Sequence, residues 1–398
     1  MNDTTGDRIR SVRKRRGLTQ AQLAAKCGLS VSWVRHQEQG VGPEPPLETL
    51  HKVAVALKVP TMTLAGDVRP PGAHPHTAED WTEVRDALHG RTPPPAEPAT
   101  PDGVLEMLDA VRPLLAANRY SAVAAVLPPL IRDARTLDSH DHGARSRVLN
   151  LTAWLLTQTR QWDDAETAAR MAIDAAGGNP LNEAAAVNTL CWSLLRQGRL
   201  TQALEMAAAK AQEIEPRFST ARPRELALWG RLLLAVTNAA IRDNRPGEAE
   251  DALSLASAAA ERIGREISAD GSTTRTFGPV TVRQIAAENA ILTERPDLVL
   301  SIAAGMPATT LHPMSASRCR HRLVEADAYV MLHDYTRAIE TFQGLQEDVP
   351  EWLAQQRYAR TILADMTSQR RLLTKDMRDL ADAVQLPLLT GYDDPPGA

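Results

Sequence analysis

Hydrogen-bonding side chains gather in a short stretch near the N-terminus, where residues 30–36 read SVSWVRH. Ser30 is placed to cap a helix whose first turns would carry Val31, Ser32, Trp33, Arg35 and His36. Arginine, serine and histidine on an exposed helical turn can hydrogen-bond to base edges in a major groove, and an apolar neighbour can contact a thymine methyl. The chemistry predicted for this stretch is recognition of double-stranded DNA.

Two short helices around a tight turn must hold these side chains. Thr19 is expected to cap the first helix, with its hydroxyl accepting from a main-chain amide two or three residues ahead. Gly28 supplies the positive φ that lets the chain reverse before Ser30. Leu23 and Val34 would face the small core between the helices.

Basic residues before this stretch are candidates for phosphate contact. A helix from Asp7 to Arg16 is predicted to bury Ile9 and Val12 and to point five cations outward: Arg8, Arg13, Lys14, Arg15 and Arg16. Arg16, Thr19 and Gln20 are the predicted phosphate contacts, because free amides at a helix N-terminus favour an anion. The alternative is that this basic face is ordinary solvated surface.

These motifs together resemble the lambda-repressor-like (Cro/XRE) DNA-binding domain. The resemblance is carried by the TQxxLAxxxGLS opening, by Glu38-x-Gly40, and by a helix with Leu50, Val53, Ala54 and Leu57. It covers residues 1–66, in which a helix over 47–58 and a short final helix over 61–65 complete the domain. The resemblance implies a helix-turn-helix domain that binds an operator.

Charge and composition place the rest of the chain in a different class of domain. The 398 residues carry a net charge of −4, yet residues 1–66 hold ten Lys and Arg against five Asp and Glu. A polyanion would therefore be drawn to one end only.

No apolar run reaches the roughly 20 residues that cross a bilayer, and the polar start does not resemble a signal peptide, so a cytoplasmic protein without a membrane partner is expected. The three cysteines are scattered, and neither a cofactor nor a metal is predicted.

A proline-rich segment over 67–102 is predicted to link two regions, because proline fixes φ and lacks an amide hydrogen. One amphipathic helix, over 78–89, interrupts it and could dock on either side. From residue 103 onward the chain is rich in Ala and Leu, and no strand pattern is found.

Small or aliphatic residues recur after short polar turns and indicate a helical repeat over 103–350. They are Val123, Ala165, Ala203, Ala249, Val299 and Ala338, at spacings of 42, 38, 46, 50 and 39 residues. The best units resemble tetratricopeptide repeats. Helices over 351–371 and 374–384, within the C-terminal region 351–398, are candidates for capping or dimerisation. The predicted fold is all-α, an N-terminal helix-turn-helix domain followed by a tetratricopeptide-like solenoid.

A duplicated Asn–Trp pair stands out in the repeats, because Asn150 and Trp154 recur 38 residues later as Asn188 and Trp192. The amide can pair with a peptide bond, and the indole can cover an apolar side chain. Related positions extend this predicted ligand face: Arg231, Asn238, Gln284, Glu288 and Arg320. The alternative is that both tryptophans pack between helices and the asparagines are solvated or cap turns.

No catalytic motif of hydrolases, nucleotide-binding proteins or metalloproteases is found, so an enzyme is not expected. A helix-turn-helix head joined to a tetratricopeptide-like body resembles the Rgg and PlcR type of peptide-sensing regulators. The resemblance implies a transcriptional regulator that forms a homodimer and responds to a peptide, as in quorum sensing. The alternatives are a small-molecule effector in place of the peptide, and a protein-interaction adaptor.

Overall fold

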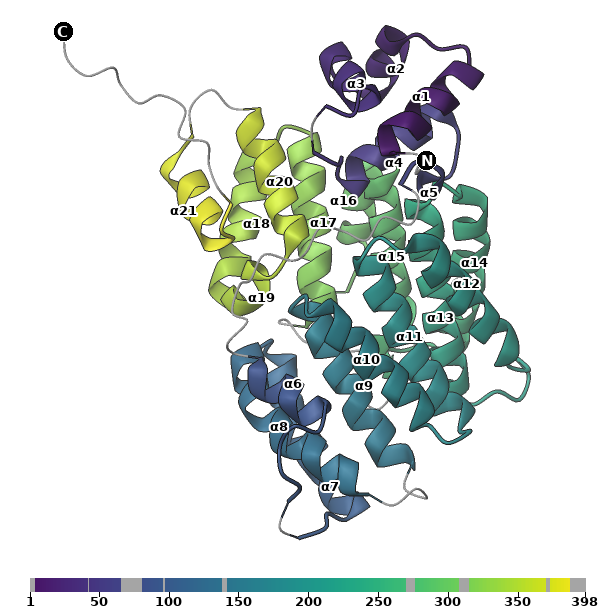
Figure 1. Cartoon of the computed structure of the whole chain (residues 1–398), viewed down its shortest axis with the longest axis vertical. Helices are drawn as coiled ribbons and strands as arrows, with labels where there is room; N and C mark the ends of the chain where they lie inside the picture. Colours follow the sequence, from purple (N-terminus) through teal and green to yellow (C-terminus); the bar gives the residue numbers. More distant parts are fainter. Residues whose placement is uncertain are drawn as a thin grey trace, which may run out of the picture. The chain divides into compact units, whose positions relative to one another are not determined.

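A computed structural model describes residues 4–41, 43–65, 81–95, 97–137, 142–269, 276–307, 315–369 and 373–386. In these residues the chain forms 21 helices and one two-stranded sheet (Figure 1), which confirms the predicted all-α class. The chain divides into two compact units, Met1–His76 with Leu149–Ile263 and Thr77–Val148 with Gly264–Ala398. The boundaries predicted from the sequence, 1–66, 67–102, 103–350 and 351–398, stay a prediction.

The N-terminal domain of the first unit, called the head below, consists of five helices. They are α1 (Thr5–Arg15), α2 (Gln20–Cys27), α3 (Val31–Glu38), α4 (Leu47–Leu57) and α5 (Thr61–Ala65). Ile9, Leu23, Val34 and Leu57 are fully buried in its core. Helix α1 begins two residues before its predicted start, because Thr4 and Asp7 form a reciprocal capping box.

The repeat helices follow as antiparallel pairs, which confirms the predicted helical repeat. Those that lie wholly or mainly in the first unit are α9 (His142–Gln158), α10 (Trp162–Asp174), α11 (Pro180–Arg196), α12 (Leu200–Glu213), α13 (Pro223–Arg242) and α14 (Pro246–Ile263). Helices α11 to α14 each pack against the next and stand side by side in Figure 1.

The second unit contains the remaining elements. Its repeat helices are α7 (Pro101–Ala116), α8 (Tyr120–Thr136), α15 (Pro279–Leu292), α16 (Pro296–Ala304), α17 (Ala316–Met331) and α18 (Tyr335–Asp348). The others are α6 (Thr82–Leu88), α19 (Pro350–Ala354), α20 (Arg357–Ser368) and α21 (Lys375–Ala383), with strands β1 (Ile267–Ser268) and β2 (Thr276–Phe277). Helix α6 packs on α8, and α21 packs on α18 and α20.

One turn geometry repeats in all six helix pairs. A residue with positive φ follows the first helix of each pair, and these residues are Asn118, Arg160, Gly198, Asn244, Glu294 and His333. In each case the next residue donates its amide to the carbonyl five residues earlier, as Arg245 does to Ala240. The six predicted repeat residues lie five positions after these turn residues and are buried, at 0 to 2% exposure. The predicted repeat register is therefore confirmed.

Three details differ from the sequence prediction. The pair β1–β2 forms where no strand pattern was recognised, with Ile267 opposite Phe277. The helix predicted over 351–371 breaks at Gln355 and Gln356 into α19 and α20, because Gln356 adopts an extended conformation. Helix α6 begins at Thr82, four residues after the start of the predicted segment 78–89, and residues 78–80 lie outside the described residues. None of the described helices is long and apolar enough to cross a membrane.

Candidate nucleic-acid interface and ligand face

The turn between α2 and α3 has the predicted capping geometry. The Thr19 hydroxyl accepts from the Gln22 amide at 3.1 Å, and the Gln22 side chain accepts from the Thr19 amide at 2.9 Å. Gly28 ends α2 with φ of 66°, and the Ser30 hydroxyl accepts from the Trp33 amide at 3.1 Å. These contacts fix the direction in which α3 leaves the turn.

Helix α3 presents most of its predicted base-reading side chains to solvent. Val31, Ser32, Arg35 and His36 are exposed, whereas Val34 is fully buried in the head core. Trp33 is half-buried and packs against that core, so part of its indole is already used inside the domain. The exposed turns of α3 therefore offer a hydroxyl, a guanidinium and an imidazole for hydrogen bonds, together with one apolar side chain.

A buried ion pair joins the helices behind this face. Arg13 donates to Glu38 at 2.5 and 2.7 Å, and the Gln20 side-chain amide donates to the same carboxylate at 2.9 Å. Burial would raise the pKa of Glu38, but the hydrogen bonds from Arg13 and Gln20 outweigh it and lower that pKa. The prediction that Arg13 points outward is wrong, because its position beside Val12 belongs to the buried face of α1.

The predicted phosphate contacts lie around this ion pair. Arg16 is exposed, and its guanidinium donates to the Lys58 carbonyl at 3.0 Å, while Lys14 and Arg15 are exposed as well. Because the Gln20 side chain is held by Glu38, a phosphate contact from Gln20 would use its main-chain amide at the start of α2. Arg8 is half-buried and donates to the carbonyls of Leu64 and Ala65, which makes it a structural residue.

In the first unit, the predicted ligand residues occupy equivalent positions of α9, α11 and α13. Asn150 and Asn188 lie ten residues before their turn residues, and Trp154, Trp192 and Asn238 lie six before theirs. Asn150, Trp154, Asn188 and Asn238 are only 4 to 7% exposed, whereas Trp192 and Arg231 are half-buried. These positions are therefore largely enclosed.

Most polar atoms of this face have partners within the chain. Asn150 accepts a hydrogen bond from the Thr189 hydroxyl of α11. Asn238 accepts from Arg242 through its carbonyl at 3.0 Å and through its side chain at 3.2 Å. The Trp192 indole N–H, by contrast, is buried and has no hydrogen-bond partner, although the Arg196 guanidinium lies 5.5 Å from the ring centroid. Sequence reasoning missed Thr189, which has no copy at the equivalent position of the neighbouring repeats, and Arg196, although Arg242 occupies the equivalent position two residues before the next turn residue.

In the second unit, two of the three other predicted residues, Glu288 and Arg320, belong to a partly buried polar cluster. Arg320 of α17 donates to Glu288 of α15, and its guanidinium lies 4.4 Å from the ring centroid of Tyr358. The Tyr358 hydroxyl donates to Asp327 at 2.5 Å, and burial together with that carboxylate raises the Tyr358 pKa. The side-chain oxygen of Gln284 is buried without a hydrogen-bond partner. Tyr358 was missed because it lies on α20, outside the repeats.

Comparison with known proteins agrees with the geometry of the head. Residues 5–65 match the model of a helix-turn-helix domain family, so the head is a helix-turn-helix domain. The presence of this domain supports the interpretation that the protein is a DNA-binding regulator.

Among solved structures, the chain is similar to PlcR of Bacillus thuringiensis, crystallised in complex with the peptide PapR7 and DNA. The identity is 13% and the TM-score 0.38, over 84% of this chain and 98% of that one. No curated protein matches the sequence.

Proposed function

We propose that this protein is a sequence-specific transcriptional regulator that binds double-stranded operator DNA as a homodimer and responds to a ligand held by its helical repeats. The observation that carries the proposal is the exposed face of α3. Its core side holds Val34, while Ser32, Arg35 and His36 point to solvent from a helix braced by a buried ion pair. A rigid helix with an exposed polar first half suits insertion into a major groove.

Each side chain of this face has a distinct role in the proposed complex. Arg35 pairs with a guanine edge, because its planar guanidinium can donate two parallel hydrogen bonds there. Ser32 and His36 contact neighbouring bases, and Val31, which is 39% exposed, contacts a thymine methyl. Arg16, Thr19 and the first amides of α2 hold the phosphate backbone.

A homodimer follows from the small size of one head. One head offers few phosphate contacts, so two half-sites about one helical turn apart, or a multiple of it, are needed for specific binding. The repeats supply the remaining surface for association of two copies.

For the ligand, we favour a short peptide whose main chain pairs with Asn150, Asn188 and Asn238. The unpartnered indole N–H of Trp192 supports the proposal, since a ligand carbonyl could accept from it. The burial of Asn150 and Trp154 instead favours a small-molecule effector, which needs less room than an extended peptide.

The test starts from duplexes selected out of a random library by the full-length protein. Arg35→Ala should weaken binding to the selected duplex by about tenfold or more, because a bidentate base contact contributes about 1–3 kcal/mol. Arg217→Ala is the matched control, since Arg217 is exposed and lies outside the head. Equal affinities of Arg35→Ala and the wild type would refute the assignment of α3.

A further inference from the structure

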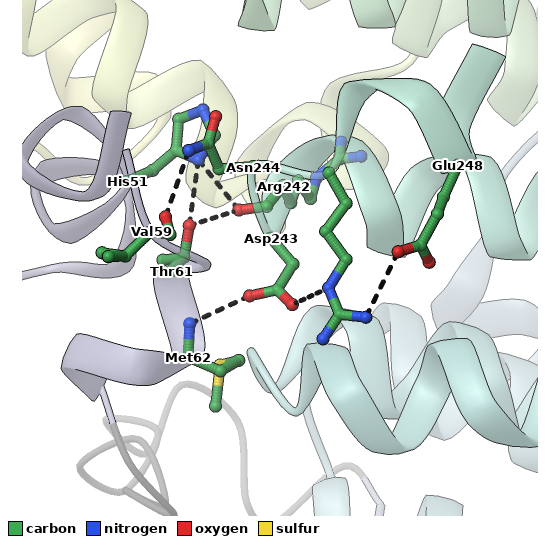
Figure 2. Close-up of polar contacts among 9 residues, drawn as sticks. His51, Val59, Thr61, Met62, Arg242, Asp243, Asn244 and Glu248 are labelled. Atoms are coloured by element: carbon green, nitrogen blue, oxygen red, sulfur yellow. Dashed lines mark hydrogen bonds and ion pairs between the residues drawn. The ribbon is translucent and has the colours of Figure 1, made fainter. Parts of the chain in front are cut away.

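A set of hydrogen bonds fastens the head to the first-unit repeats at the turn Arg242–Asn244, where α13 ends (Figure 2). The Arg242 carbonyl accepts from the His51 ring Nδ1 at 2.8 Å and from the Thr61 hydroxyl at 2.8 Å. Since a carbonyl can only accept, the His51 tautomer must carry its proton on Nδ1. Two side chains of α4 and α5 therefore meet on a single main-chain oxygen.

The hydrogen bonds of Asp243 are the strongest evidence that the fold specifies this contact between the head and the repeats. Its side chain is fully buried, and its carboxylate accepts from the Met62 amide at 2.9 Å and from Arg245 at 2.9 Å. Its carbonyl accepts from the Thr61 amide at 3.2 Å. A buried carboxylate is costly unless it is hydrogen-bonded, and here one donor belongs to the head.

This carboxylate distinguishes the turn from the other five repeat turns. The residue before the positive-φ position is Ala117, Thr159, Gln197, Thr293 or Leu332 in those turns. Asn244 adds a further contact, because its side-chain amide donates to the Val59 carbonyl at 3.1 Å while its φ is 57°. The contacts use α4, α5 and the loop between them, and the reading face of α3 stays exposed.

The same turn is connected to the predicted ligand face along α13. Arg242 donates its guanidinium to the carbonyl and side chain of Asn238, one helical turn earlier, while its own carbonyl holds His51 and Thr61. A ligand that takes over the Asn238 side-chain oxygen would remove one of these bonds from Arg242, the residue whose carbonyl holds the head.

From these contacts we propose that Arg242–Asn244 is a latch that sets the orientation of the head on the repeats and transmits changes at Asn238 to it. The latch rests on the proposed regulator function, for which it names the route of regulation. Because the half-sites of an operator are read by two oriented heads, the latch would determine which half-site spacing the dimer accepts.

The first experiment measures docking without DNA, by hydrogen exchange of the Thr61 and Met62 amides in the full-length protein. The double variant His51→Leu/Thr61→Val and the single variant Asn244→Gly should each speed this exchange by about tenfold or more, since each removes hydrogen bonds of the latch. Glycine keeps the positive φ of that turn, so Asn244→Gly changes the contact and leaves the turn conformation intact.

Thr293→Val is the matched control. Its hydroxyl also donates to a main-chain carbonyl, that of Asn289 at 2.9 Å, and it should leave the exchange of the head amides unchanged. Arg242→Met tests the connection to Asn238 and should speed the same two amides. Exchange within about twofold of the wild type in the double variant and Asn244→Gly would overturn the latch, and the same result in Arg242→Met would overturn its link to α13.

The second experiment uses duplexes selected by the wild-type protein, with the spacer between half-sites changed one base pair at a time. The latch variants should keep single half-site affinity within about twofold and lose at least about fivefold of the discrimination between spacers. An unaltered spacer profile would overturn the orientation role. If the wild type bound no duplex, the proposed regulator function would fail, while the exchange experiment would still decide whether the head is latched.

Discussion

The buried pair Arg13–Glu38 offers a quantitative test of how the head is held together. Arg13 and Glu38 are 8% and 5% exposed, and Arg13 supplies two of the three hydrogen bonds that the carboxylate accepts. The variant Arg13→Met keeps much of the side-chain volume and removes both donors. It leaves a buried carboxylate with only the Gln20 amide, a loss for which about 3–5 kcal/mol is typical.

Protonation limits that loss and makes it depend on pH. A carboxyl with an ordinary pKa of 4.5 can take up a proton at pH 7 for about 3.4 kcal/mol, at 1.36 kcal/mol per unit of pH. The expected cost of Arg13→Met is therefore about 3 kcal/mol or more at pH 7, and it is smaller at pH 5 by up to about 2.7 kcal/mol, the free energy of two units of pH. In the wild type the folded pKa is lowered, so the contribution of Glu38 is present above pH 4.5 and is lost as the pH falls through the folded pKa.

The assay is hydrogen exchange of the α1 and α3 amides at pH 7 and pH 5, corrected for intrinsic exchange rates. Arg13→Met should lose about 100-fold protection or more at pH 7, and a clearly smaller factor at pH 5. The double variant Arg13→Met/Glu38→Leu, which replaces the pair by apolar side chains, should regain most of the protection at both pH values. A loss below tenfold at pH 7, or an equal loss at both pH values, would refute the reasoning.

Three further substitutions test other parts of the structure. Gly6→Ala should destabilise the head by about 1–3 kcal/mol, because the new methyl would collide with a main-chain carbonyl of α3, whereas Gly247→Ala, with open space around it, should be neutral or stabilising in the same thermal unfolding measurement. Ser30→Ala should cost about 1 kcal/mol by removing the cap of α3, measured by hydrogen exchange of that helix; no change would mean that the cap is dispensable. Tyr358→Phe should destabilise the second unit by about 1–3 kcal/mol in urea unfolding through loss of its bond to a half-buried carboxylate of α17, and an unchanged midpoint would contradict that role.

Local signals in the sequence were sufficient for the caps and the repeat register. Thr19, Gly28 and Ser30 act through neighbours within three residues, so their types and spacing specify the turn between α2 and α3. The repeat residues were equally readable, because each is a small or aliphatic side chain that follows a polar turn at a fixed distance. Both patterns depend on a few adjacent residues.

Features that depend on contacts distant in the sequence were not readable in this way. Arg13 lies four residues after Ile9, and this spacing places it on the buried face, but its charge suggested solvent exposure until Glu38, 25 residues later, was in place. The break at Gln355 and Gln356 has no proline or glycine to mark it. The latch pairs Thr61 with a turn 181 residues away, and nothing near either end signals the other.

Several polar side chains of the predicted ligand face already have bonding partners within the chain, and any effector that binds there must compete with these partners. Asn150 is paired with Thr189, Asn238 with Arg242, and Glu288 with Arg320, so a ligand at these positions must replace bonds that already exist. Binding is weakened by that replacement, and the same replacement is what distinguishes the bound from the free state. In the proposed latch, a ligand that exchanged the Asn238–Arg242 bond would act at the residue whose carbonyl holds His51 and Thr61. Coupling between two sites is typically about 1–3 kcal/mol, which corresponds to a change of roughly 5- to 150-fold in operator affinity.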